Sequence, residues 1–452
     1  MPTPIKWGSE FLVNTTTADS QSEPNMTALA DGRFVVTWQD ESAGDFDIRA
    51  QIFNADGSKS GSEFIAHTDA TDFKVAPMVT ALQGGGFVLA WQDNDTFGIS
   101  ARVFDAAGDP IGDEIALDTA VDPTLVALAA GGFAILWEDT QDGDVRAQLY
   151  DAAGDASGPT TTINTTVLGP QTQPAAASLT NGGFVVVWTD GSANELGDFA
   201  TGLNVRAQRY DENGFAVGSE FVVSATTAGD QDAAAVIGLA DGRFVVAWQD
   251  HGGADAEIVA QIFNADGTKF GGEFTVHTTS TDDQRDISLT ALADGRFVVT
   301  WTDYSQTGDD TSGAAVRAQV FNGDGTTSGD EFLVNTTTAQ GQGFPSVSVL
   351  ADGRLVFAWL DASQTGGDTD GNAIRGQIFE PRTGPVTLFG SGFDDSLVGT
   401  FLDDTIEGRS GDDELHGDNG QDTLRGEEGN ASRWPRQRSP GWRQRQRFSA
   451  RR

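Results

Sequence analysis

The chain has 452 residues, 67 of them acidic and 27 basic, which gives a formal net charge of −40. This charge disfavours nucleic acids and anionic membranes as partners and favours cations. The absence of Cys excludes disulfides and thiolate metal sites. No run of 18 apolar residues occurs, so we expect no membrane span, and the N-terminus lacks the apolar stretch of a cleavable Sec-type signal.

Seven copies of one unit fill residues 10–380. Each has a Gly-containing turn, an apolar strand ending in Trp-x-Asp, a strand ending in Phe or Tyr, an EFLVN-type strand, and a weaker strand that leads into the next copy. The seven tryptophans are Trp38, Trp91, Trp137, Trp188, Trp248, Trp301 and Trp359. No helical period occurs. Four short strands per copy predict an all-β fold, with a seven-bladed β-propeller at 10–384 after a lead of residues 1–9. An open β-solenoid is the alternative.

The order of the strands suggests how the ring closes. An EFLVN-type strand occurs at 10–14, before the first Trp strand, and none follows Phe379. If this strand is the outer edge of each blade, residues 10–14 supply the edge that the seventh blade lacks. Closure of this kind also removes the exposed edge strands of an open array.

Residues that recur in every copy are expected to be structural. The tryptophans are interpreted as filling the space between blades rather than stacking on sugars. The aspartates of Trp-x-Asp are expected to cap turns or pair with an Arg on the next strand, although Ser100 and Val259 replace that Arg in two copies. These aspartates are Asp40, Asp93, Asp139, Asp190, Asp250, Asp303 and Asp361.

Ligand binding should break the sevenfold symmetry, and the loops after Trp-x-Asp vary most. The longest lie within 189–208, 302–319 and 360–377. The segment DTDGN at 368–372 suggests a cation loop but lacks the full EF-hand pattern. His67 and His277 share one position at the end of an edge strand, where a solvated surface is expected. No nucleophile elbow, HExxH motif or P-loop occurs, and nothing selects a carboxylate pair for glycoside hydrolysis among the 67 acids.

A new period of nine residues begins at Gly390. The repeats are GSGFDDSLV, GTFLDDTIE, GRSGDDELH and GDNGQDTLR, each with Asp at the sixth position and an apolar residue two positions later. A disordered acidic linker would not keep the apolar residue in phase. The pattern resembles the RTX (haemolysin-type) calcium-binding repeat, G-G-x-G-x-D-x-U-x.

The resemblance implies a short parallel β-roll over residues 385–430 that binds Ca²⁺. In such repeats two nonapeptides form one coil, so Asp395 should face Asp413, and Asp404 should face Asp422. Phe393 and Leu402 replace Gly at the fourth position of the first two repeats, which weakens the match there. The expected metal-site residues are Asp395, Asp404, Gly408, Gly411, Asp413, Gly417, Gly420, Asp422, Gly426 and Gly429.

Similarity to RTX proteins also implies type I secretion and calcium-driven folding outside the cell. The sequence thus predicts an extracellular calcium-binding protein whose propeller is a binding or adhesion module for glycans or cell-surface components, without a nucleic-acid partner. An extracellular polysaccharide hydrolase or lyase, with its site at the propeller mouth, is the alternative. No residue is singled out as catalytic.

The tail at 431–452 differs in character, with eight Arg and no acidic residue. A basic arm of this kind is typical of nucleic-acid or anionic-surface binding. However, Arg-Gln-Arg is also the shifted-frame reading of Gly-Asn-Asp codons, and a shifted translation restores a nine-residue Gly and Asp period. We therefore interpret the tail as an out-of-frame reading of further RTX repeats, in which the expected export signal is missing.

Overall fold

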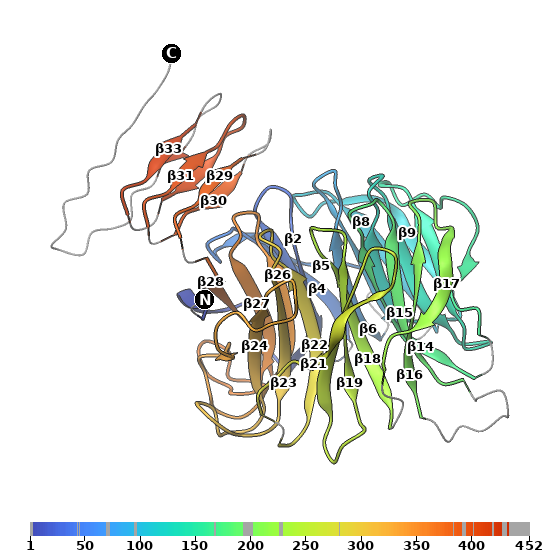
Figure 1. Ribbon diagram of the computed structural model, residues 1–452. Helices are drawn as coiled ribbons and strands as arrows, with labels where there is room; N and C mark the ends of the chain where they lie inside the picture. The colour runs from blue at the N-terminus through green and yellow to red at the C-terminus, as the bar shows by residue number, and fades with distance from the viewer. Residues whose placement is uncertain are drawn as a thin grey trace.

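A computed structural model describes residues 3–433 except 43, 45, 69–72, 95–96, 167–168, 193–201, 226–228, 280, 383, 391–394, 401, 418–419 and 427–431. Within these residues the regular structure is entirely β-strand. Seven four-stranded antiparallel sheets form a propeller, and two small parallel sheets follow it (Figure 1). None of the described segments is a helix long and apolar enough to cross a membrane.

Each blade follows one strand order, from an inner strand to an outer strand. The inner strands are β2 (Gln21–Ala28), β6 (Lys74–Ala81), β10 (Ala120–Ala127), β14 (Gln171–Ser178), β18 (Gln231–Gly238), β22 (Gln284–Ala291) and β26 (Gln342–Val349). The Trp strands are β3 (Phe34–Asp40), β7 (Phe87–Asp93), β11 (Phe133–Asp139), β15 (Phe184–Asp190), β19 (Phe244–Asp250), β23 (Phe297–Asp303) and β27 (Leu355–Asp361).

The third strands are β4 (Asp47–Phe53), β8 (Gly98–Phe104), β12 (Val145–Tyr150), β16 (Asn204–Tyr210), β20 (Glu257–Phe263), β24 (Ala315–Phe321) and β28 (Ala373–Glu380). The outer strands are β5 (Lys59–Ile65), β9 (Pro110–Asp118), β13 (Thr161–Thr162), β17 (Ala216–Val222), β21 (Lys269–Thr275), β25 (Phe332–Leu333) and, for the last blade, β1 (Ile5–Leu12). We number the blades 1 to 7 in the order of their Trp strands.

The propeller has two distinct faces. Inner strands of neighbouring blades contact one another and surround the axis. In each blade the inner strand begins where the Trp strand ends, as the pairing of Gln21 with Asp40 shows. We call this end the Trp-Asp face and the opposite end, where the Gly-containing turns lie, the turn face.

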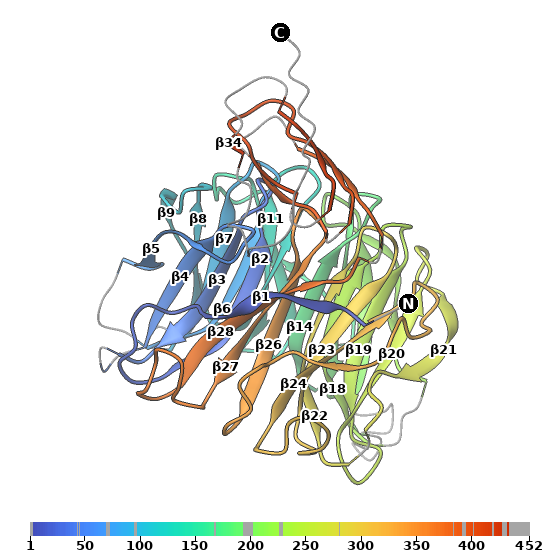
Figure 2. The ribbon, with the colours of Figure 1, turned by 90° about the vertical axis from the view of Figure 1, so that its left-hand side faces the viewer.

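The N-terminal strand closes the ring. β1 pairs antiparallel with β28 of blade 7, with Ile5 opposite Glu380 and Leu12 opposite Arg375. Figure 2 shows β1 crossing beside β28. The predicted closure is confirmed, and the strand begins at Ile5, within the segment expected to be a lead. The open solenoid is therefore wrong.

Seven apolar clusters fill the spaces between neighbouring blades. Trp137 is 4% exposed, and the other six repeated tryptophans are fully buried. A Phe and a Phe or Tyr from paired strands stack in most blades, as Phe34 and Phe53 do at 5.0 Å between centroids. The repeated aromatics are thus core residues, as the sequence predicted.

The Trp-x-Asp aspartates also have the expected structural roles. Arg49 Nε donates to Asp40 Oδ2 at 2.5 Å, and the equivalent pair recurs in four further blades. The same carboxylate accepts the backbone amide of Ser42, which caps the turn. Glu63 of blade 1 accepts from the amide of Thr15, which follows β1, at 2.6 Å. Glu220, Glu331 and Glu10 accept equivalent amides in other blades, so each of these glutamates joins its blade to the previous one.

The expectation for two histidines was wrong. His67 and His277 are each only 7% exposed, so they do not lie on a solvated surface. His277 Nε2 accepts the amide of Ile258 at 3.0 Å, where other copies use an Asn side chain, as Asn14 does for Ile374. The imidazole thus replaces a buried Asn side chain. Either side chain links the end of the outer strand to the third strand by a hydrogen bond.

The nonapeptides form a short parallel roll with an 18-residue coil. One sheet contains β29 (Thr387–Phe389), β31 (Thr405–Glu407) and β33 (Thr423–Arg425), and the other contains β30 (Ser396–Val398), β32 (Glu414–His416) and β34 (Ser432–Arg433). The in-phase apolar residues Leu397, Ile406, Leu415 and Leu424 make a core of their own. The predicted two-nonapeptide coil is confirmed.

Truncating one repeated tryptophan should be costly. Trp188→Ala empties a fully buried site between blades 3 and 4, so we expect the free energy of unfolding to fall by about 3–5 kcal/mol. Urea unfolding would measure this. The control Phe215→Ala removes a ring that is 70% exposed and should change stability by no more than about 0.5 kcal/mol. Equal losses in both variants would contradict the core assignment.

Candidate calcium repeats and ligand-binding face

The four repeat aspartates lie buried along the roll. Asp395, Asp404, Asp413 and Asp422 are between 1% and 7% exposed. Because pairing strands are 18 residues apart, Asp413 Oδ1 accepts the amide of Asp395 at 3.1 Å, and Asp422 Oδ1 accepts that of Asp404 at 3.1 Å. The stacking that the RTX resemblance implied is therefore present. Four buried carboxylates in one small roll would be costly without a cation.

The first Gly of each repeat leaves room for these carboxylates. A Cβ added to Gly399 would lie 2.6 Å from Asp404 Oδ2 and 2.9 Å from the carbonyl oxygen of Gly417. Gly408 and Gly417 face Asp413 and Asp422 in the same way. Carboxylate and carbonyl oxygens thus converge where a side chain would block them. This donor set fits Ca²⁺, which takes six to eight oxygen ligands.

The third and fourth repeats match the pattern better than the first two. Gly411 and Gly420 have φ values of 130° and 118°, a conformation that disfavours L side chains. Leu402, at the same position of the second repeat, does not have a positive φ, and its neighbour Asp404 instead accepts from Thr400 Oγ1 at 3.0 Å. Phe393 and Gly429 lie outside the described residues, whereas Gly426 follows β33.

Backbone carbonyl oxygens lie beside the buried carboxylates of the roll, as that of Gly417 does near Gly399 and Asp404. No group of three or more Asp, Glu or His side chains with the geometry of a metal site occurs anywhere in the part of the chain that the structure describes. In the suggested cation loop at 368–372, the carboxylate of Asp368 already has other partners. Asp368 is 1% exposed and accepts from Asn14 Nδ2 at 2.8 Å and from the amide of Asp370.

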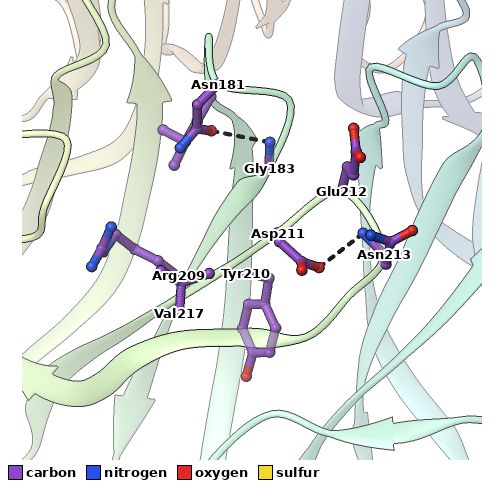
Figure 3. A pocket seen from close by; sticks show the side chains of 9 residues that line it. Asn181, Gly183, Arg209, Tyr210, Asp211, Glu212, Asn213 and Val217 are labelled. Carbon is purple, nitrogen blue, oxygen red and sulfur yellow. Dashed lines mark hydrogen bonds between the residues drawn. The ribbon is translucent and has the colours of Figure 1, made fainter.

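A small pocket opens on blade 4 at the turn face (Figure 3). It has a volume of about 210 Å³ and lies between two turns, next to Gly183 and Arg209. Its polar groups already serve the turns, because Asn181 Oδ1 accepts the amide of Gly183 and Asp211 Oδ1 accepts that of Asn213. We therefore assign no ligand to this pocket.

A second cavity of about 250 Å³ lies on the axis and is lined by inner strands of blades 2 to 6. Small residues such as Ala127, Ala176 and Gly238 line it. It offers few side-chain hydrogen-bonding groups, so it is a poor candidate for a specific polar site.

The Trp-Asp face differs from the turn face near the propeller axis. There, the residues at the start of the inner strands vary from blade to blade. The third residue of every inner strand has a φ between 47° and 55°, which is unusual for residues other than Gly. These residues are Glu23, Ala76, Asp122, Gln173, Ala233, Asp286 and Phe344. Side chains of one blade hold this bulge in the next, as Glu23 Oε2 does when it accepts the amide of Ala76 at 3.1 Å. The backbone repeats here, but the side chains do not.

Two acidic residues on blade 3 have pKa values above those of ordinary carboxyl groups. Asp122 lies in the bulge of β10, and Glu138 lies on β11 opposite Val121. Burial raises the pKa of Asp122, and burial together with the charge of Asp122 raises the pKa of Glu138 to about 7. On blade 6, burial also raises the pKa of Asp286. Sequence reasoning missed these acids, because nothing in a single copy distinguishes them from other loop carboxylates.

Blades 1 and 2 carry aromatic side chains in their loops on the same face. The rings of Phe46 and Phe73 are 4.3 Å apart between centroids. Phe97 is 71% exposed and Phe73 is 43% exposed. The amide of Asn94 donates to the carbonyl of Phe73, and Gln92 Oε1 accepts the amide of Asp122 at 3.4 Å. Because Gln92 Nε2 donates to Asn94 Oδ1 at 2.6 Å, these bonds link the backbone at Phe73 with the backbone at Asp122.

Comparisons with known proteins agree with this architecture. Residues 398–431 match the family model of the RTX calcium-binding nonapeptide repeat, in four copies. The match begins after most of the first repeat, which contains Phe393 in place of Gly. No protein with a curated description matches the chain.

Two solved structures are similar to the chain at low identity. A protein of unknown function from Dyadobacter fermentans DSM 18053 has a TM-score of 0.53 at 14% identity, covering 84% of this chain and 100% of that one. A fungal alcohol oxidase of the AA5 family has a TM-score of 0.54 at 13% identity, covering 86% and 82%. At such identities the similarity shows the fold alone. The chain is thus an all-β protein in which a seven-bladed propeller is followed by RTX calcium-binding nonapeptide repeats.

Proposed function

We propose that this is an extracellular calcium-binding protein whose propeller is a binding module and whose nonapeptide roll folds around Ca²⁺. Asp395, Asp404, Asp413 and Asp422, with carbonyls such as those of Gly408 and Gly417, would hold the ions. The bound cation would offset the repulsion among buried carboxylates and contribute folding free energy. Type I secretion accords with the absence of Cys and with the net charge of −40.

The ligand of the propeller is proposed to be a glycan at the Trp-Asp face. The observation that supports this is the concentration of non-repeated aromatic and acidic side chains on one face of an otherwise repetitive molecule. Exposed rings such as Phe97 can cover the apolar face of a sugar, while Asp122, Glu138 and Gln92 offer hydrogen-bonding groups for hydroxyls. The net charge favours a neutral or amine-bearing glycan over an anionic one.

An extracellular enzyme acting on polysaccharides is the second candidate. The observation that favours it is the adjacent pair of Asp122 and Glu138. A carboxyl group with a pKa of about 7 is protonated in about half of the molecules at neutral pH and can act as a general acid.

Calcium should stabilise the roll through the repeat aspartates. We expect Asp413→Ala, or removal of Ca²⁺ with EDTA, to lower the melting temperature of the C-terminal segment, because Asp413 is 1% exposed and stacks on Asp395. Calorimetry with and without Ca²⁺ would measure this. Asp412→Ala removes the same charge from an exposed neighbour and should retain the calcium effect. No shift with either treatment would refute the calcium assignment.

The aromatic group should determine glycan binding. We expect the double variant Phe73→Ala and Phe97→Ala to lose at least about tenfold in affinity for any glycan that the wild type binds, as loss of buried aromatic contacts does. A glycan array followed by titration calorimetry would measure this. Phe215→Ala removes an equally exposed ring on the turn face and should bind normally. Equal losses in both would place the ligand elsewhere.

The pKa of Glu138 should make stability depend on pH. The folded protein keeps this proton up to a pH of about 7, whereas an ordinary glutamate loses it near 4.5. The contribution of Glu138 to stability should therefore fall as the pH rises from about 4.5 to 7. We expect Glu138→Gln to gain stability relative to wild type across this window in urea unfolding, with exposed Glu212→Gln as the charge control. A constant difference between wild type and variant at all pH values would contradict the raised pKa.

A further inference from the structure

The roll lies against the place where the propeller ring closes. The chain leaves β28, the strand that pairs with β1, and enters the roll within a few residues. Figure 2 shows the roll above this part of the ring, on the turn face. Among the described residues, three groups of contacts join the two parts, and all of them involve residues at the seam where blades 7 and 1 meet.

The first contact is apolar. Val398 ends β30 and follows Leu397, which points into the core of the roll. Val398 is 1% exposed and belongs to the propeller cluster that contains Trp7 of β1 and Trp38 of blade 1. The other three nonapeptides have Glu407, His416 and Arg425 at this position. An apolar residue is thus present only in the repeat that packs on the propeller.

The second contact is a buried ion pair. Arg354 and Asp352, in the turn of blade 7, are 2.7 Å apart, and both side chains are fully buried. Arg354 stacks on the ring of Trp7 at 4.1 Å and donates to the carbonyl of Ala55 in blade 1 at 2.6 Å. The amide of Val398 donates to the same Asp352 carboxylate at 3.3 Å. The roll therefore adds one hydrogen bond to a buried charge pair whose arginine also contacts blade 1.

The third contact reaches the nonapeptide turns themselves. Arg382 pairs with Glu380 of β28 at 2.6 Å and donates to the carbonyl of Asp352. Its Nη2 also lies 3.4 Å from the carbonyls of Val398 and Gly399. Gly399 is the residue whose missing side chain makes room for Asp404 Oδ2. One guanidinium thus contacts both the closing strand pair and a repeat turn that would be ordered by calcium.

We infer that the roll is a calcium-dependent latch on the propeller: when Ca²⁺ orders the roll, Val398 and the turn at Gly399 cover the seam and stabilise the pairing of β1 with β28. This inference rests on the proposed calcium binding. Without an ordered roll, Val398 would leave the cluster around Trp7, and the Asp352–Arg354 pair would lose both its cover and the amide of Val398. Loss of apolar cover and of a hydrogen bond to a buried charge weakens the seam selectively.

The experiment uses the full chain and two readouts in Ca²⁺ and in EDTA. Fluorescence of the buried tryptophans follows melting of the propeller, and hydrogen exchange follows the amides of β1 and β28. For the wild type we expect Ca²⁺ to raise the propeller melting temperature by several degrees and to slow exchange in β1. In Val398→Ser, calorimetry should still detect Ca²⁺ binding, but less than half of the melting shift should remain.

Two further variants separate docking from folding of the roll. His416→Ser changes the residue paired with Val398 one coil later and should keep the wild-type shift. Arg382→Lys keeps the charge but loses the guanidinium geometry, and it should reduce the shift without abolishing calcium binding. The latch is refuted if the wild type binds Ca²⁺ with no change in the propeller, or if Val398→Ser shows the full shift. Absence of Ca²⁺ binding by the wild type would instead refute the proposed calcium function, and the latch with it.

Discussion

Ring closure by β1 is the constraint on which the rest of the molecule depends. Every blade must bury one face against each neighbour, because the repeated tryptophans lie between blades. An open array would expose such a face at both ends, together with unpaired strand edges. The pairing of Ile5 with Glu380 removes these ends, but it joins residues that are far apart in sequence and is entropically the most demanding step of the fold. This explains why the seam has so many additional contacts.

Repetition made most of the fold predictable from sequence. Seven copies of Trp-x-Asp gave the blade number, and the position of the EFLVN-type strand gave the closure. The roles of residues that occur in only one or two copies were harder to predict from the sequence. His67 and His277 looked like surface residues because one copy does not show that the position receives a backbone amide. Val398 differs from Glu407, His416 and Arg425 at the same repeat position, but this difference alone does not indicate which part of the chain it contacts. The roles of such residues depend on long-range contacts, which no local pattern encodes.

The candidate sites also differ in whether local sequence or long-range contacts determine them. The aspartates of the roll could be placed from a nine-residue period, because period, turn chemistry and stacking all follow from local sequence. The acids Asp122 and Glu138 could not, because their raised pKa values depend on how the folded chain surrounds each carboxyl group and on the charge of Asp122 near Glu138. Most arginines of the third strands are paired with Trp-x-Asp aspartates. Because these arginines already form ion pairs with those aspartates, the remaining acidic residues give the surface its net negative charge.

Closure also determines how each part of the chain tolerates a change in length. A ring of seven blades has no position for an eighth, since one more unit would alter every interface between blades. The roll grows by stacking coils, so nonapeptides can be added or lost at its far end while existing coils keep their neighbours. Ser432 already pairs with Glu414 in the register of a next coil. If the reading frame changes beyond Asn430 as the sequence suggests, only this open-ended element would be affected, because all seven blades precede it in the chain.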